Sequence, residues 1–131
     1  MNARPRGTSR WLLLAAMAGA ASLAGAQVIE IAWDGQGRFK REVRAEPGKF
    51  VELCGKLSVG TKVRWRFEAD AATHFNLHYH EGKDVRFPVQ EDGVRSSKGT
   101  LDVRSAQDYC WMWSNKGSAP AAITVEMAKG G

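Results

Sequence analysis

The sequence lacks the motifs by which the commonest enzyme classes are recognised. It has no Gly-rich phosphate loop, no HExxH zinc motif and no nucleophile elbow. No histidine follows Cys110, although a blue-copper site needs a second histidine shortly after its cysteine. We therefore expect a protein that is not an enzyme. A small metal-dependent enzyme is the remote alternative, since it would need three protein ligands and an open water position.

The chain also lacks a strong surplus of charge. Its 131 residues have a net charge of +5, and residues 1–26 hold three arginines and no acidic residue, which leaves +2 for residues 27–131. In that part the basic residues are interleaved with Glu and Asp along the sequence. This pattern indicates a mixed, solvated surface and argues against nucleic acid as a partner.

The N-terminus has the pattern of an export signal. Three arginines precede an apolar run over residues 11–23, and Ala24-Gly25-Ala26 fits a small-x-small cleavage site. The run is shorter than the roughly 20 apolar residues of a membrane-spanning helix; a retained membrane anchor is the alternative. We predict a signal peptide over 1–26, cleaved after Ala26, and a single domain over 27–131. The mature protein is expected in the periplasm or outside the cell and does not span a membrane.

The part after residue 26 shows no helical periodicity. Short runs alternate between apolar and polar residues and are separated by turn residues, which is typical of all-β proteins. The sequence predicts an antiparallel β-sandwich, jelly-roll-like in character, of about eight short strands. The runs cover residues 28–33, 39–44, 49–54, 61–68, 74–80, 84–89, 100–104, 108–113 and 121–127.

All three histidines fall in one of these runs. His74, His78 and His80 occupy even positions, whereas Phe75 and its apolar neighbours occupy the odd ones. Since successive side chains of a strand point to opposite faces, the odd residues are predicted in the core and the imidazoles on the other face.

These histidines are the candidate site. His78 and His80 lie two apart on one strand face and can converge on one ion; His74 joins them if the strand bends, and Glu81 is a weaker ligand. Imidazole suits Cu and Zn. We expect an exported binding protein of the bacterial cell envelope, with a ligand or partner at this strand and Cu or Zn as candidate ions. The alternative is a structural or protein-interaction module without a metal site; neither the ligand nor the partner is identified.

Cysteine and tryptophan add two further predictions. Cys54 and Cys110 are the only cysteines, and two cysteines in an exported chain usually pair, so a disulfide is expected; a soft metal ligand or a free thiol is the alternative. Trp111 and Trp113 share one face of their strand. They either pack in the core or form an exposed interaction surface.

Two segments resemble a known family. Phe50-Val-Glu-Leu-Cys54 and Tyr109-Cys-Trp-Met-Trp-Ser-Asn115 are similar to the cysteine-bearing strands of the GOLD domain of emp24-type cargo receptors. The run Phe75-Asn-Leu-His-Tyr-His-Glu-Gly82 resembles the FNxHYHEG segment of small bacterial exported relatives. The resemblance covers residues 46–128 and implies a compact β-sandwich with Cys54 bonded to Cys110. The chain lacks the coiled coil, membrane span and cytoplasmic tail of the receptors, so cargo sorting is not implied.

Overall fold

The computed structural model describes residues 26–131, and all of its regular elements in that range are β-strands. The predicted signal peptide lies, but for Ala26, outside the described residues and stays a prediction. Among residues 26–131 we find no helix of the length and apolar character that a membrane span requires. The strands are β1 (Gln27–Glu30), β2 (Arg38–Ala45), β3 (Phe50–Leu57), β4 (Lys62–Glu81), β5 (Asp84–Asp102), β6 (Gln107–Ser114) and β7 (Ala121–Gly130).

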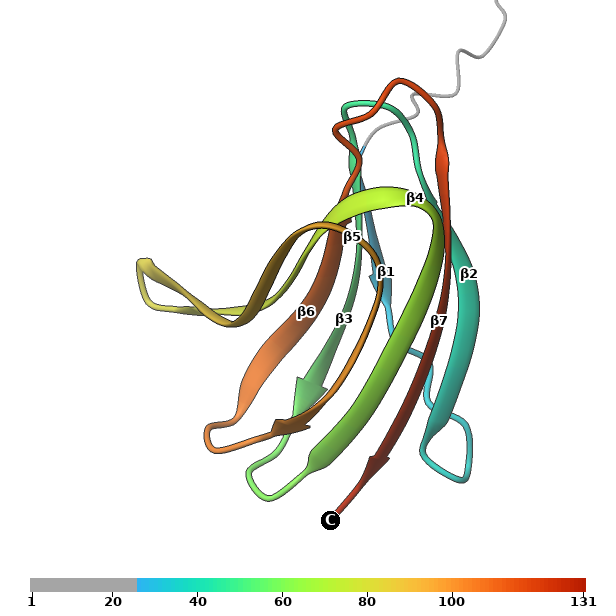
Figure 1. Ribbon diagram of the computed structural model, residues 1–131. Helices are drawn as coiled ribbons and strands as arrows, with labels where there is room; N and C mark the ends of the chain where they lie inside the picture. Colours follow the sequence, from blue (N-terminus) through green and yellow to red (C-terminus); the bar gives the residue numbers. More distant parts are fainter. Residues whose placement is uncertain (1–25) are drawn as a thin grey trace, which may run out of the picture.

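The strands form one sheet that curls into two facing layers (Figure 1), with the hydrogen-bonded order β1-β3-β6-β4-β7-β2. Strand β4 belongs to both layers. Its first part, Lys62 to Ala69, pairs with β7, and its second part, His74 to Tyr79, pairs with β6. Strand β5 pairs with the other edge of β4. In Figure 1 β4 rises, arches over the molecule and continues into a β4–β5 hairpin that projects from the body.

The bend of β4 falls where the sequence suggested a loop. The register with β5 shifts between Glu68 and Thr73 and again between Thr73 and Phe75. Such bulges bend a strand and increase its twist without ending its pairing. As a result, the predicted strands 61–68 and 74–80 are two parts of one continuous strand.

The predicted fold class, an all-β sandwich with one disulfide, is confirmed, but its strands are fewer and longer than expected. The described residues form seven strands, and the polar segments 91–93 and 96–99, predicted as connections, lie inside β5. Their polarity reflects the exposure of β5 to solvent, not a turn. All pairs are antiparallel except β1 with β3, which are parallel.

The core between the layers is aromatic. Trp65 and Phe67 come from the first part of β4, Phe75 from the second and Trp113 from β6; the ring centroids of Phe67 and Phe75 are 4.7 Å apart, and those of Phe67 and Trp113 are 5.4 Å apart. These separations are favourable for aromatic pairs. Phe75 is fully buried, as the strand alternation predicts. The two layers are therefore held together by rings from both parts of one strand.

Of the two alternatives for Trp111 and Trp113, the structure shows packing in the core and not an exposed interaction surface. Both indoles have 0 % exposure. The reason is the position of β6, which pairs with β3 on one edge and β4 on the other, so that one of its faces covers the core. Cys110 lies on the opposite face and forms the predicted disulfide with Cys54 directly across the strand pair, with a Cα–Cα distance of 4.1 Å.

Asn115 ties together the connections at one end of the sandwich. Its Nδ2 donates hydrogen bonds to the carbonyl oxygens of Ala45 at 3.0 Å and Ala119 at 2.7 Å, and its Oδ1 accepts from the Gly117 amide at 2.9 Å. The side chain is almost fully buried. It forms hydrogen bonds with backbone groups of the 115–120 connection and of the last residue of β2, and these bonds also satisfy its own buried polar atoms.

Candidate functional site

The outer face of the β3–β6–β4 layer carries two rows of side chains that run across the three strands. In one row Cys54 lies opposite Cys110, and Cys110 lies opposite His78. The neighbouring row consists of Glu52, Met112 and Asn76. The two rows are two residues apart along the strands, about 6.5–7 Å at Cα, so their side chains can reach one another. The disulfide therefore has an imidazole and a carboxylate beside it.

His78 is buried in spite of its place on the outer face, with 6 % exposure. Its Nδ1 lies 2.7 Å from Oδ1 of Asn76. An amide oxygen only accepts hydrogen bonds, so Nδ1 carries the proton and donates it to Asn76. The neutral ring then holds its lone pair on Nε2, which lies 3.6 Å from Oε2 of Glu52.

Glu52 faces this lone pair from β3. Its side chain is 14 % exposed, and burial raises the pKa of its carboxyl above the usual value, although the nearby His80 acts in the opposite direction. Among residues 26–131, no lysine or arginine pairs with Glu52. Burial, together with His80, lowers the pKa of His78 below 6.5. Both shifts favour the neutral forms of the two groups and so oppose an ion pair between Glu52 and His78.

Cys110 completes a compact set of donor atoms but is not available as a ligand. One atom each of Glu52, His78 and Cys110 lie within 4.8 Å of one another, and no other such set is found among residues 26–131. The Sγ of Cys110 is bonded to Cys54, so it is not a thiolate. A cysteine binds a metal ion as a thiolate, so the disulfide removes Cys110 from the set and leaves His78 and Glu52 as the donors.

His80 extends this pair toward solvent. Its ring lies 5.5 Å from that of His78, centroid to centroid, in an edge-on arrangement, and the His80 side chain is exposed. The ring of Phe87, on β5, lies 5.9 Å from His78. The two histidines of the predicted pair are thus brought together, with the exposed ring free to turn toward the buried one.

His74 and Glu81 lie elsewhere. His74 is four residues from His78, about 13 Å along an extended strand, and its Nδ1 contacts Oδ1 of Asp92 at 3.0 Å. This hydrogen bond holds the pKa of Asp92 below its usual value. Glu81, at the exposed end of β4, lies 3.8 Å from Arg86. The bulges of β4 do not bring His74 to the other two histidines.

The sequence interpretation missed Glu52 and the role of Asn76. Glu52 lies two residues before Cys54 and therefore on the same strand face. That spacing, combined with the predicted disulfide, places Glu52 beside Cys110. The spacing does not predict that β4 pairs with the other edge of β6. This pairing brings His78 to the same place.

No protein-family model matches the chain, and no curated protein matches its sequence. Solved structures share its fold. PliG of Aeromonas hydrophila, a periplasmic lysozyme inhibitor of g-type lysozyme, aligns with 81 % of this chain and 98 % of its own, at a TM-score of 0.65 and 9 % identity. PliG of Salmonella Typhimurium covers 81 % of this chain and 100 % of its own, at a TM-score of 0.54 and 11 % identity.

A third similar structure is the Yersinia pseudotuberculosis-derived mitogen. It covers 70 % of this chain and 84 % of its own, at a TM-score of 0.54 and 12 % identity. At these identities the likeness concerns the fold alone. The resemblance to the GOLD domain rests on short sequence motifs and stays a prediction.

Proposed function

We propose that this chain is an exported, non-enzymatic binding protein that holds a divalent transition-metal ion, Zn(II) or Cu(II), between His78 and Glu52, with His80 as the third ligand. One observation carries the proposal. Asn76 fixes the tautomer of His78 so that the Nε2 lone pair points at a desolvated carboxylate 3.6 Å away. Two such acceptors face each other favourably only with a cation or a proton between them.

The separation of the two atoms suits a metal ion. Zinc binds imidazole nitrogen at about 2.0–2.1 Å and carboxylate oxygen at about 2.0–2.2 Å, which places tetrahedral ligands roughly 3.4 Å apart. The distance from Nε2 of His78 to Oε2 of Glu52, 3.6 Å, needs an adjustment of only a few tenths of an ångström. A metal-binding histidine also donates its other N–H to an oxygen, as His78 does to Asn76.

Export and the absence of enzymatic activity rest on separate grounds. The N-terminal pattern predicts cleavage after Ala26, and a disulfide suits an oxidising compartment. Two of the similar structures are described as periplasmic inhibitors, which are binding proteins. The site offers a buried ligand pair on a flat strand face and no nucleophile–base pair.

Protein binding is a second candidate, favoured by the β4–β5 hairpin. Val85 and Phe87 near its end are 39 % and 45 % exposed and lie two residues apart on β5, so they form a small exposed apolar patch. The hairpin projects from the body (Figure 1), as a segment that docks on a partner would. Since Phe87 also lies against His78, a protein partner at the hairpin would cover the proposed metal site.

Calorimetric titration with Zn(II) and Cu(II) tests the metal proposal. We expect a Kd below about 100 μM for at least one ion, which corresponds to a binding free energy of more than roughly 5 kcal/mol. His78→Gln and Glu52→Gln should each weaken binding about tenfold or more. The matched control is His74→Gln, which removes a histidine of the same strand outside the site and should leave the affinity unchanged.

Weaker binding than this, or an affinity that neither His78→Gln nor Glu52→Gln alters, would contradict the metal proposal. An equal loss in His74→Gln would also contradict it, because binding would then reflect any histidine of the chain. Binding of a protein partner that depends on Phe87 and not on His78 would support the second candidate instead.

A further inference from the structure

The first part of β4 carries a second surface, on the outer face of the β2–β7–β4–β5 layer. An open hollow of about 1080 Å³ crosses this face, and we call it the basic groove. Its only acidic residues are Asp34 and Glu126. Its cations are Arg38, Lys40, Arg64, Arg66, Lys98 and Lys129. The groove thus has a surplus of four positive charges, whereas residues 27–131 as a whole have a net charge of +2. The remainder of the mature chain is net negative.

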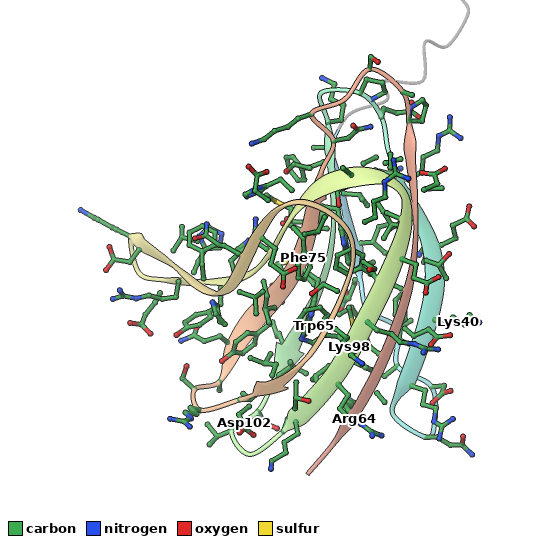
Figure 2. All side chains as sticks on the ribbon, in the orientation of Figure 1. Lys40, Arg64, Trp65, Phe75, Lys98 and Asp102 are labelled. Carbon is green, nitrogen blue, oxygen red and sulfur yellow. A yellow bond between two sulfur atoms is a disulfide. The ribbon has the colours of Figure 1, made fainter. Side chains whose placement is uncertain are left out.

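Strand register arranges these cations as a grid. One row consists of Lys40, Glu126, Arg66 and Lys98 on four neighbouring strands. In the next row Arg38 and Arg64 flank Ala128, and Thr100 follows. Cations two residues apart on a strand are about 6.5–7 Å apart at Cα, and neighbouring strands are about 4.8 Å apart. Figure 2 labels Lys40, Arg64 and Lys98, which come from β2, β4 and β5.

Glu126 occupies the middle of the first row. Lys40 contacts it at 3.2 Å and Arg66 also pairs with it, and these contacts lower the pKa of its carboxyl. Arg64 and Lys98, in contrast, make no ion pair within residues 26–131. The groove therefore contains two cations without an acidic partner, Arg64 and Lys98, beside Glu126, whose carboxylate already pairs with two cations.

The shape of the groove suits an extended ligand. A second hollow of about 540 Å³ shares Arg66, Lys98 and Glu126 with it and continues along β4 and β5 toward Ser96. A single small anion would need an enclosed site that surrounds it with donors. The second hollow adds one acid, Glu68, and no further cation, so the binding charge lies in the two rows of the basic groove. Cations spread along these rows match a polymer with repeated negative charges.

The aromatic side chains that line the groove, Phe39 and Trp65, are half-buried and buried, and Lys129 already lies over the ring of Trp33, 5.0 Å from its centroid. Trp65 is 5 % exposed and lies on the core side, stacked on Phe67, and the partly buried Phe39 packs edge-on against Trp33. Proteins that bind single-stranded nucleic acid offer exposed rings on which bases stack. The groove offers charge without such a platform.

We propose that the basic groove binds an acidic polysaccharide, through Arg38, Arg64 and Lys98 as the primary contacts. Carboxylate or sulfate groups of the polymer would accept hydrogen bonds from the guanidinium and ammonium groups. Glu126 opposes this binding, because it adds a negative charge and engages Lys40 and Arg66. This site is separate from the proposed metal site, which lies on the second part of β4.

The test uses heparin as a sulfated probe and polygalacturonate as a carboxylated one, with neutral dextran as the control, in the presence of a chelator that removes metal ions. We expect both acidic polymers to bind and dextran not to. Arg64→Gln/Lys98→Gln should weaken binding about tenfold or more and reduce the slope of log affinity against log salt by about 1–2. Glu126→Gln should strengthen binding about threefold or more, since it releases two cations.

The matched control is Lys83→Gln/Arg95→Gln, which removes the same charge from exposed positions of the hairpin and β5 outside the groove. It should change the affinity less than about threefold. An equal loss in this control would overturn the proposal, because net charge alone would then explain binding. A Glu126→Gln variant that binds no tighter would also overturn it, because the polymer would then not bind beside Glu126. Tighter binding of oligo-dT than of a polysaccharide of equal charge would assign the groove to nucleic acid instead.

Discussion

The two parts of β4 present opposite environments on their outer faces. In the first part the outward residues Arg64 and Arg66 are exposed, whereas in the second part the outward residues Asn76 and His78 are buried. Both parts bury their inward residues in the same core. The difference arises because the second part lies beside the disulfide, Glu52 and Phe87.

This contrast separates two ways of preparing a surface for a ligand. Exposed cations remain hydrated, so they cost little stability and attract a partner over a distance that salt screens. A buried imidazole facing a carboxylate has lost its water, so it destabilises the ligand-free protein until an ion or a proton arrives. Four experiments test how far the two parts depend on each other.

The largest effect is expected from the ring that joins the parts. Phe75→Ala removes a fully buried ring in contact with Trp65, Phe67 and Trp113, and should lower the free energy of unfolding by about 3–5 kcal/mol. Urea denaturation measures it. Phe87→Ala, which removes an exposed ring from the hairpin, is the control and should cost less than about 1 kcal/mol. Similar losses in the two variants would mean that the layers do not share one core.

The disulfide should matter more to the second part of β4 than to the first. Cys54→Ala/Cys110→Ala removes the disulfide, which joins residues 56 positions apart, and should lower the free energy of unfolding by about 2–4 kcal/mol. Hydrogen exchange should then rise first in β3 and β6, while the pairing of β2 with β7 keeps its protection. A uniform rise across all strands would show that the two layers open as one.

The smallest effect concerns pH and isolates the pair His78 and Glu52. Burial lowers the pKa of His78, so the unfolded chain binds its proton at a higher pH than the folded chain does. The free energy of unfolding should therefore fall as pH drops below about 6.5, and His78→Gln should reduce this fall. His74→Gln serves as the control; the same reduction there would assign the effect to another histidine.

Glu52 acts in the opposite sense. Its pKa is raised, so its contribution to stability is present below pH 4.5 and is lost as pH rises through the raised value. In Glu52→Gln the amide can donate to Nε2 of His78. We therefore expect the metal-free variant to be about 1 kcal/mol more stable than the natural protein at pH 7.5. A less stable variant would mean that the carboxylate already has a favourable partner.

The sequence predicts the inner half of this molecule well. The alternation of Val63, Trp65 and Phe67, and later of Phe75 and Leu77, identifies the core face, and all five are buried. The disulfide also follows from composition and predicted export. Period-two alternation is a local property of the sequence. It predicts which face of a strand is buried without any knowledge of which strands are its neighbours.

The outer surfaces depend on which strands become neighbours, and that is not a local property. Glu52 and His78 meet only because β6 lies between β3 and β4. Likewise, basic residues that alternate with acidic ones in the sequence are sorted onto one face when Lys40, Arg66 and Lys98 come into register. The bend of β4 was missed because bulges keep a strand paired through residues that interrupt the alternation.

The passage of β4 through both layers has a consequence for how this fold can change over generations. A layer made of its own strands can be exchanged between proteins as a module. Here neither layer is complete without the strand that builds the other. Substitution of outward side chains can therefore change either surface within this shared frame, whereas a shift in the register of β4 would alter both surfaces at once.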